Sequence, residues 1–173
     1  MGSLLGRQKI AMVYGGGRVG LMGIIADALL SAGGEVIGVI PQEFVTREEA
    51  HRGIDELCVV KTMHERKAKM AELSDFFIAL PGGFGTLEEF CEVLTWTQIG
   101  YHTKACGLLN VDKFFDPLLL FFDHASAVGF ISQEDRSIVI ARETPHDLLA
   151  AVAESQLALD RKPDASQTEA GCQ

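Results

Sequence analysis

Two side chains stand out as candidates for chemistry, Arg66 and Glu89. Arg66 falls within an apolar stripe that Met63, Met70 and Leu73 form at helical spacing. A guanidinium in such a stripe is costly unless it reaches water or meets a partner. Its stem therefore snorkels to the surface or pairs with a structural carboxylate, or else the group contacts a substrate or Glu89. The residues alone leave these explanations open.

Glu89 lies near the start of a helix that the apolar repeat predicts from Thr86 to about Gly100. Thr86 and Glu89 have the T-x-x-E spacing of a capping box, and that role alone would explain the glutamate. A carboxylate at a helix N-terminus stays ionised. Beside a bound phosphate it would suit stabilisation of positive charge on a sugar, or activation of water. We expect the neighbouring Glu88 to point to solvent.

A glycine turn, 81–86, joins the short apolar strand predicted at 76–80 to this helix. Its three glycines let the backbone approach an anion closely, and the helix N-terminus offers unpaired N–H donors. We interpret it as a phosphate-binding turn.

An earlier glycine turn, 15–20, satisfies G-x-G-x-x-G between a predicted strand and a predicted helix. In a dinucleotide-binding fold, an acidic residue some way after this motif accepts a hydrogen bond from a ribose hydroxyl. Glu35 lies at about the right separation along the sequence. Taken alone, the motif fits a plain turn and a phosphate site equally. Because the carboxyl ends of parallel strands share one edge, we expect both glycine turns to open onto one crevice and hold one phosphorylated ligand.

The elements that must position these residues alternate between short apolar strands and longer helices. This alternation predicts a single α/β domain with a doubly wound, Rossmann-like parallel sheet. The domain is expected at residues 1–159, and a disordered polar tail at 160–173. The first seven residues show little pattern, and 42–55 is expected to be a loop with one helical turn. Strands are predicted at 10–14, 35–40, 57–60, 76–80, 105–109 and 137–141, and helices at 20–32, 63–74, 86–100, 112–129 and 145–159.

Composition and charge exclude several classes of partner. A formal charge of −9 over 173 residues argues against nucleic acid and anionic membranes. No stretch reaches the roughly 18 apolar residues that span a bilayer, and the N-terminus lacks a signal-peptide pattern. Four widely spaced cysteines, three of them expected in the core, indicate a reduced, cytoplasmic protein. His64, His102 and His124 lack metal-ligand spacing, so we expect neither metal nor cofactor.

Taken together, these motifs resemble the LOG ("Lonely Guy") family of cytokinin riboside 5′-monophosphate phosphoribohydrolases, often labelled lysine decarboxylases. The resemblance covers roughly residues 13–150. It rests on three motifs, Gly-Gly-Gly with Gly-Leu-Met-Gly at 15–23, Met-His-Glu-Arg-Lys at 63–67 and Pro-Gly-Gly-Phe-Gly-Thr-Leu-Glu-Glu at 81–89.

The resemblance implies hydrolysis of the N-glycosidic bond of a purine nucleoside 5′-monophosphate, which gives free base and ribose 5-phosphate. The family's catalytic arginine and glutamate fall on Arg66 and Glu89. The residues implied to bind substrate are Gly82, Gly83, Gly85 and Thr86 at the phosphate, and Gly16, Gly17, Met63 and Lys67 elsewhere in the pocket. Lys67 lies at the rim of its helix's apolar stripe, where a solvated side chain is the simpler explanation. Family members are homodimers or larger homo-oligomers.

One departure from the family concerns the N-terminus. Family members usually begin with another strand, a glycine-serine turn and a helix, whereas this sequence starts partway through that helix, around Leu4 to Gln8. We therefore expect a shortened domain. Two other functions stay open, a non-catalytic nucleotide or cofactor carrier of the same superfamily, and an NAD-dependent oxidoreductase that would use 15–20 and Glu35.

Overall fold

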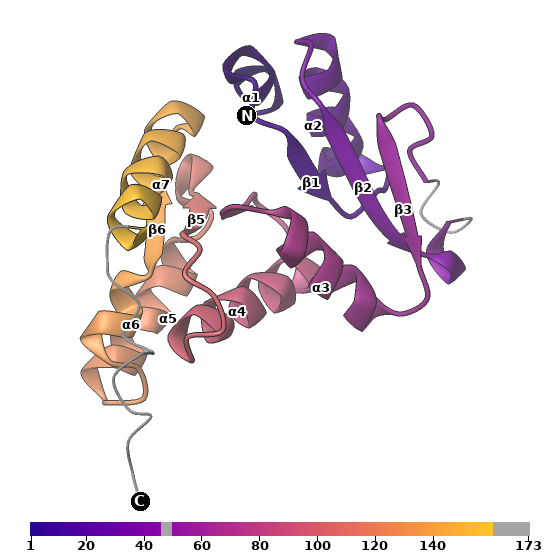
Figure 1. Ribbon diagram of the computed structural model, residues 1–173. Helices are drawn as coiled ribbons and strands as arrows, with labels where there is room; N and C mark the ends of the chain where they lie inside the picture. Colours follow the sequence, from indigo (N-terminus) through magenta and orange to yellow (C-terminus); the bar gives the residue numbers. More distant parts are fainter. Residues whose placement is uncertain (46–49, 161–173) are drawn as a thin grey trace, which may run out of the picture. The chain divides into compact units, whose positions relative to one another are not determined.

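The structure is a computed structural model that describes residues 1–45 and 50–160 (Figure 1). It divides into two compact units, residues 1–75 and 76–173. Nearly all of the predicted polar tail lies outside the described residues, as does part of the loop predicted at 42–55.

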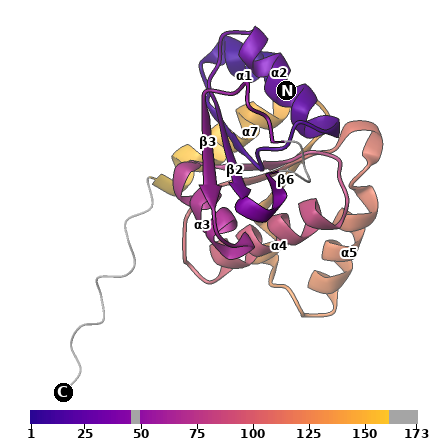
Figure 2. The same ribbon diagram turned by 90° about the vertical axis from the view of Figure 1, so that its right-hand side faces the viewer.

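The first unit is built on a three-stranded parallel sheet in the order β1-β2-β3. Met12 pairs with Val36, and Gly38 pairs with Leu57. Strands β2 and β3 lie side by side in both Figure 1 and Figure 2. The elements of this unit are α1 (Gly2–Gln8), β1 (Met12–Tyr14), α2 (Gly20–Ser31), β2 (Val36–Pro41), the 3-10 turn η1 (Gln42–Phe44), β3 (Glu56–Val60) and α3 (Met63–Leu73).

The first residues of the chain form a helix, α1, although their sequence shows little pattern. Glycine explains why α1 can pack so closely on α2. A Cβ built on Gly6 would lie 2.7 Å from the Cβ of Ala32 and 2.9 Å from the carbonyl oxygen of Leu29. Close backbone approach at the glycines thus adds to the burial of Leu5, an apolar side chain of α1 that belongs to the core.

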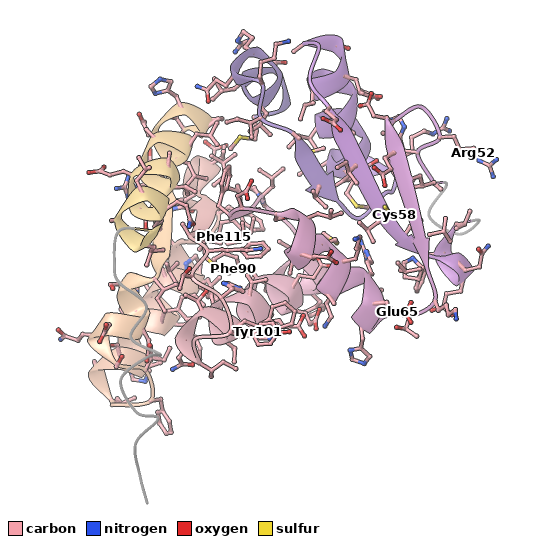
Figure 3. All side chains as sticks on the ribbon, viewed as in Figure 1. Arg52, Cys58, Glu65, Phe90, Tyr101 and Phe115 are labelled. Atoms are coloured by element: carbon pink, nitrogen blue, oxygen red, sulfur yellow. The ribbon has the colours of Figure 1, made fainter. Side chains whose placement is uncertain are left out.

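The second unit carries another three-stranded parallel sheet, in the order β4-β5-β6. Phe90 and Phe115, labelled in Figure 3, belong to the buried core that covers this sheet together with Ala79, Cys106 and Leu108. The elements are β4 (Phe77–Ala79), α4 (Phe84–Gln98), β5 (Cys106–Leu109), the 3-10 turn η2 (Val111–Lys113), α5 (Asp116–Ala127), α6 (Gln133–Ser137), β6 (Val139–Arg142) and α7 (Pro145–Asp160).

The predicted α/β class with parallel strands is confirmed, whereas helix α6 was not anticipated. Residues 133–137 form α6, because the Ser132 hydroxyl caps the helix by accepting from the N–H of Asp135 at 2.9 Å. The last strand consequently begins at Val139 rather than at Ser137. Within the described residues, β1 and β4 each pair with a neighbour on one side only.

Two further observations bear on the composition argument. In the part of the chain that the structure describes, no helix combines the length and apolar character needed to cross a bilayer. Of the cysteines expected in the core, Cys106 is buried, but Cys91 is exposed. The assignment of Cys91 to the core is therefore wrong, since it lies on the solvent side of α4.

Asn110 organises the junction between β5 and α5. Its side chain is buried; Oδ1 accepts from the N–H of Phe115 at 2.7 Å, and Nδ2 donates to Asp116 Oδ1 at 2.7 Å. Its own N–H donates to the carbonyl of Arg142 on β6. One amide side chain thus sets the start of α5 at the end of a buried strand.

Replacing Asn110 by alanine should lower the free energy of unfolding by about 1–3 kcal/mol, because the buried N–H of Phe115 loses its acceptor. Urea denaturation measures this change. Asp116→Asn, which keeps an acceptor for Nδ2, serves as the control and should cost less. Equal stability of Asn110→Ala and the wild-type protein would contradict this account.

Candidate functional site

Arg66 is buried with 8% of its surface exposed, so its side chain does not snorkel to solvent. Nε donates to the main-chain carbonyl of Val39 on β2 at 3.1 Å, and Nη1 donates to Met63 Sδ at 3.4 Å. Nη2 lies directly over Gly15, where a Cβ would overlap it. The guanidinium is therefore held where β1 and β2 end, in a place that only a glycine at position 15 leaves open.

The glycine turn that follows β1 is buried at residues 15, 16 and 17. Gly16 has a positive φ of 76°, and a Cβ there would approach Ile40 Cβ and Leu57 Cδ1 to 3.2 Å. Both the backbone conformation and the space require glycine. The two predicted substrate-binding glycines, Gly16 and Gly17, thus lie beside the residue that contacts Arg66.

Helix α3, which carries Arg66, starts with a variant of the capping box in which the glutamate accepts from the residue before the N-cap. Thr62 Oγ1 accepts from the N–H of Glu65 at 3.1 Å, and Glu65 Oε2 accepts from the N–H of Lys61 at 2.8 Å. Glu65 is labelled in Figure 3. These two hydrogen bonds fix the first turn of α3. Met63 and Lys67 are both half-buried on the same helix.

The capping box predicted at Thr86 and Glu89 is wrong. Helix α4 begins earlier, at Phe84, with Gly83 as its N-cap in an extended conformation (φ −96°, ψ −150°). Thr86 consequently sits inside the first turn, and its hydroxyl lies over Gly82, where a Cβ would overlap it. Glu89 falls in the second turn, so capping no longer explains why a glutamate stands there.

The start of α4 is open to an anion. Gly83, Phe84 and Gly85 are exposed, and among the described residues no side chain caps this end of the helix. Its first N–H groups are those that bind phosphate in α/β folds. Glu89 is half-buried one turn further along, and Glu88 is exposed, as expected.

Glu35 does not occupy the position that a dinucleotide site requires. It precedes β2, at the amino end of the sheet, and its carbonyl accepts from the N–H of Met12 at the start of β1. The glycine turn follows the opposite, carboxyl end of β1. The predicted contact between Glu35 and a ribose hydroxyl is therefore wrong, because the separation along the sequence does not reveal at which end of the strand the acid lies.

A polar pair that the sequence does not signal lies beside the first glycine turn. His51 Nε2 meets Asp27 Oδ1 at 3.0 Å, with the histidine buried and the aspartate mostly exposed. Tyr14, the last residue of β1, is also buried; this burial, together with the negative charge of Asp27, raises the pKa of its hydroxyl to about 12. Asp27 and His51 are 24 residues apart, so no local motif connects them.

Within each unit, the structure brings several predicted site residues together. In the first unit, Arg66 and Met63 adjoin the turn that contains Gly16 and Gly17, while in the second Thr86 covers Gly82. Gly83 and Gly85 belong to the exposed start of α4, and Glu89 follows one turn on. Across the described ranges, no group of three or more His, Cys, Asp or Glu side chains is placed to hold a metal ion.

Comparisons with known proteins agree on one family. A family model described as "Possible lysine decarboxylase" matches residues 22–152. The chain is 53% identical to the cytokinin riboside 5′-monophosphate phosphoribohydrolase of Rhodococcoides fascians, over 88% of this chain and 77% of that protein. It is 49% identical to the rice (Oryza sativa subsp. japonica) enzyme of that name, called LOG, over 89% of this chain and 64% of that protein.

Solved structures with similar folds are more distant in sequence. The molybdenum cofactor binding protein from Rippkaea orientalis superimposes with a TM-score of 0.66 at 23% identity, and the match covers 88% of this chain and 82% of that one. The molybdenum cofactor carrier protein of Chlamydomonas reinhardtii gives a TM-score of 0.64 at 20% identity, over 91% and 83% of the two chains. These likenesses establish the α/β fold.

Gly15→Ala should displace Arg66 and lower the free energy of unfolding by about 1–3 kcal/mol, because the new methyl group overlaps Nη2. Chemical denaturation measures the loss. The double-mutant cycle with Arg66→Lys isolates the contact, since lysine has no Nη2 and should absorb the methyl group.

Gly85→Ala is the matched control, because nothing lies within 4 Å of a Cβ at that position. It should leave stability unchanged or raise it slightly. If Gly15→Ala lowers the free energy of unfolding equally in the wild-type and Arg66→Lys backgrounds, the proposed contact between Gly15 and Arg66 is contradicted.

Proposed function

Because the chain belongs to the family described as possible lysine decarboxylase, which contains the LOG proteins, we propose that it hydrolyses purine nucleoside 5′-monophosphates. The bond broken is the N-glycosidic bond, and the products are free base and ribose 5-phosphate. Cytokinin nucleotides and AMP are the candidate substrates. The relatives' names suggest the substrate class, and the geometry of each unit supports the roles that we propose for the residues.

The observation that carries the proposal is the buried guanidinium of Arg66. It lies against the carboxyl ends of β1 and β2, the edge at which parallel α/β sheets bind ligands. A buried guanidinium keeps its charge and its planar set of N–H donors at this edge of the sheet, which suits it to orient an anionic ligand. A phosphorylated sugar is an anion of the kind that such a guanidinium binds. We assign Arg66 the role of orienting the ribose phosphate.

The start of α4 is the proposed site for the 5′-phosphate. Gly83 and Gly85 expose the backbone, and Thr86 adds a hydroxyl beside Gly82. Together with the dipole of a 15-residue helix, these N–H groups favour a dianion. In the first unit, Gly16, Gly17, Met63 and Lys67 are the further proposed contacts with the nucleotide.

Glu89 is the proposed catalytic carboxylate. As the bond between C1′ and the base nitrogen breaks, its electron pair leaves with the base, and positive charge develops on the ribose. An ionised Glu89 would stabilise this oxocarbenium-like centre and orient the water that attacks C1′. The water oxygen ends on the sugar, and a water proton goes to the base.

Decarboxylation of lysine, which the family description suggests, finds no residue to support it. Pyridoxal-dependent chemistry needs a lysine whose amine is desolvated. Every lysine in the described part of the chain is at least partly exposed. Hydrolysis at the sugar agrees better with the arginine and glutamate found here.

We further propose that the protein is a cytoplasmic homodimer or larger homo-oligomer. Ile99 and Tyr101, which follow α4, are 68% and 77% exposed, as is typical of apolar side chains that a second copy covers. Sedimentation velocity should therefore show a species of at least twice the chain mass. A monomer at micromolar concentration would contradict this part of the proposal.

Incubation with AMP and with isopentenyladenosine monophosphate should release free base, which chromatography quantifies. Glu89→Gln should slow the release by about 10²–10⁴-fold, because the neutral amide no longer stabilises the developing charge. Glu88→Gln is the matched control, since it makes the same change one residue earlier on an exposed side chain. Its rate should stay within about threefold of the wild-type rate.

The proposal fails if neither nucleotide is cleaved, or if Glu89→Gln is as fast as the wild type. Binding of AMP without release of base would instead favour the carrier function left open by the sequence. Calorimetric titration with AMP on the same sample separates these two results.

A further inference from the structure

The connection from β2 to β3 contacts the first glycine turn through its backbone. Ala50 forms an antiparallel bridge with Gly17, and the N–H of His51 donates to the carbonyl of Gly16 at 2.9 Å. The turn needs such support because Gly16 and Gly17 have no side chains of their own to hold them. Its position is therefore imposed by the residues around it.

The side chain of His51 anchors this contact on its other side. Only 6% of the residue is exposed; Nδ1 accepts from the N–H of Gly53 at 3.2 Å, and Nε2 lies 3.0 Å from Asp27 Oδ1. Because Nδ1 is an acceptor, the proton of the neutral ring is on Nε2 and is donated to Asp27. The hydrogen bonds thus select one tautomer.

Asp27 belongs to α2, the helix into which the glycine turn leads. His51 therefore joins three parts of the first unit, namely the turn through its backbone, its own loop through Gly53, and α2 through Asp27. A turn of small residues becomes rigid when the segments before and after it are tied together. The imidazole provides that tie without lying in the turn itself.

We propose that His51, held by Asp27, is a positioning residue that fixes the Gly16–Gly17 turn in the form that binds the nucleotide. The inference rests on the proposed function, in which this turn contacts the substrate. His51 touches no reacting atom. Its loss should therefore weaken binding and leave the chemical step almost unchanged.

His51→Ala should raise the KM for AMP about tenfold or more, while kcat changes less than about threefold. His51→Gln places an amide where Nε2 lies, so it can still donate to Asp27 and should recover most of the lost affinity. His51→Asn keeps only the acceptor for Gly53 and should recover less. Asp27→Ala should follow His51→Ala, whereas Asp27→Asn keeps an acceptor and should be milder.

Asp55 supplies the matched control from the same loop. Its Oδ2 accepts from the N–H of Val36 at 2.8 Å, so it anchors the loop at the amino end of β2, away from the glycine turn. Asp55→Ala should lower the melting temperature and leave both KM and kcat as in the wild type. A variant that only loses stability thus differs from His51→Ala, because its melting temperature falls while its KM stays unchanged.

Hydrogen exchange on the ligand-free protein tests the tie independently of turnover. His51→Ala should speed exchange in peptides covering 15–20, and Asp55→Ala should not. Unchanged exchange at 15–20 in His51→Ala overturns the proposal, as does an unchanged KM in an active enzyme. If the wild type releases no base from either nucleotide, the proposed function fails, and hydrogen exchange still decides whether His51 holds the turn.

Discussion

The burial of one guanidinium constrains most of the first unit. Arg66 leaves water to lie against the ends of β1 and β2, and this position costs free energy unless every neighbour accommodates the group. Val39 must present its carbonyl, Met63 its sulfur, and Gly15 an open space. The position of α3 against the sheet and the glycine at position 15 are thus tied to one charge held in one place.

Arg66 also shows what the sequence could predict. Periodicity alone placed a cation on the apolar side of a helix, and the structure confirms that Arg66 is buried there, although Leu73 at the end of the stripe is exposed. The parallel α/β class followed equally directly from strands and helices of the right lengths. The predicted ribose contact of Glu35 was wrong. The number of residues between the glycine motif and the acid is the same whether the acid begins or ends its strand, so the sequence does not distinguish the two positions.

The rest could not be predicted, for reasons that differ from residue to residue. The T-x-x-E spacing occurs at both 62–65 and 86–89, yet only the first caps a helix, because Gly83 takes the N-cap position ahead of Thr86. Periodicity does not reveal helix α1, because two of its three buried residues are glycines, and only the family resemblance placed a helix there. His51 and Asp27 meet only after the chain has folded, and neither residue stands in a motif. Sequence patterns therefore predict a residue whose type is unusual for its position, such as a charge in an apolar stripe. They do not predict features that depend on close backbone contacts or on residues far apart in the sequence.

The capping box at the start of α3 has a consequence for the direction in which Arg66 points. Successive residues of an α-helix are rotated by about 100° around its axis, so the first residue sets the azimuth of all that follow. Thr62 and Glu65 define that first residue, and Arg66 comes immediately after Glu65. If α3 began one residue earlier or later in the same place, the guanidinium would turn away from Val39. The hydrogen bonds of Thr62 and Glu65 at the helix start thus determine the direction in which the buried guanidinium of Arg66 points.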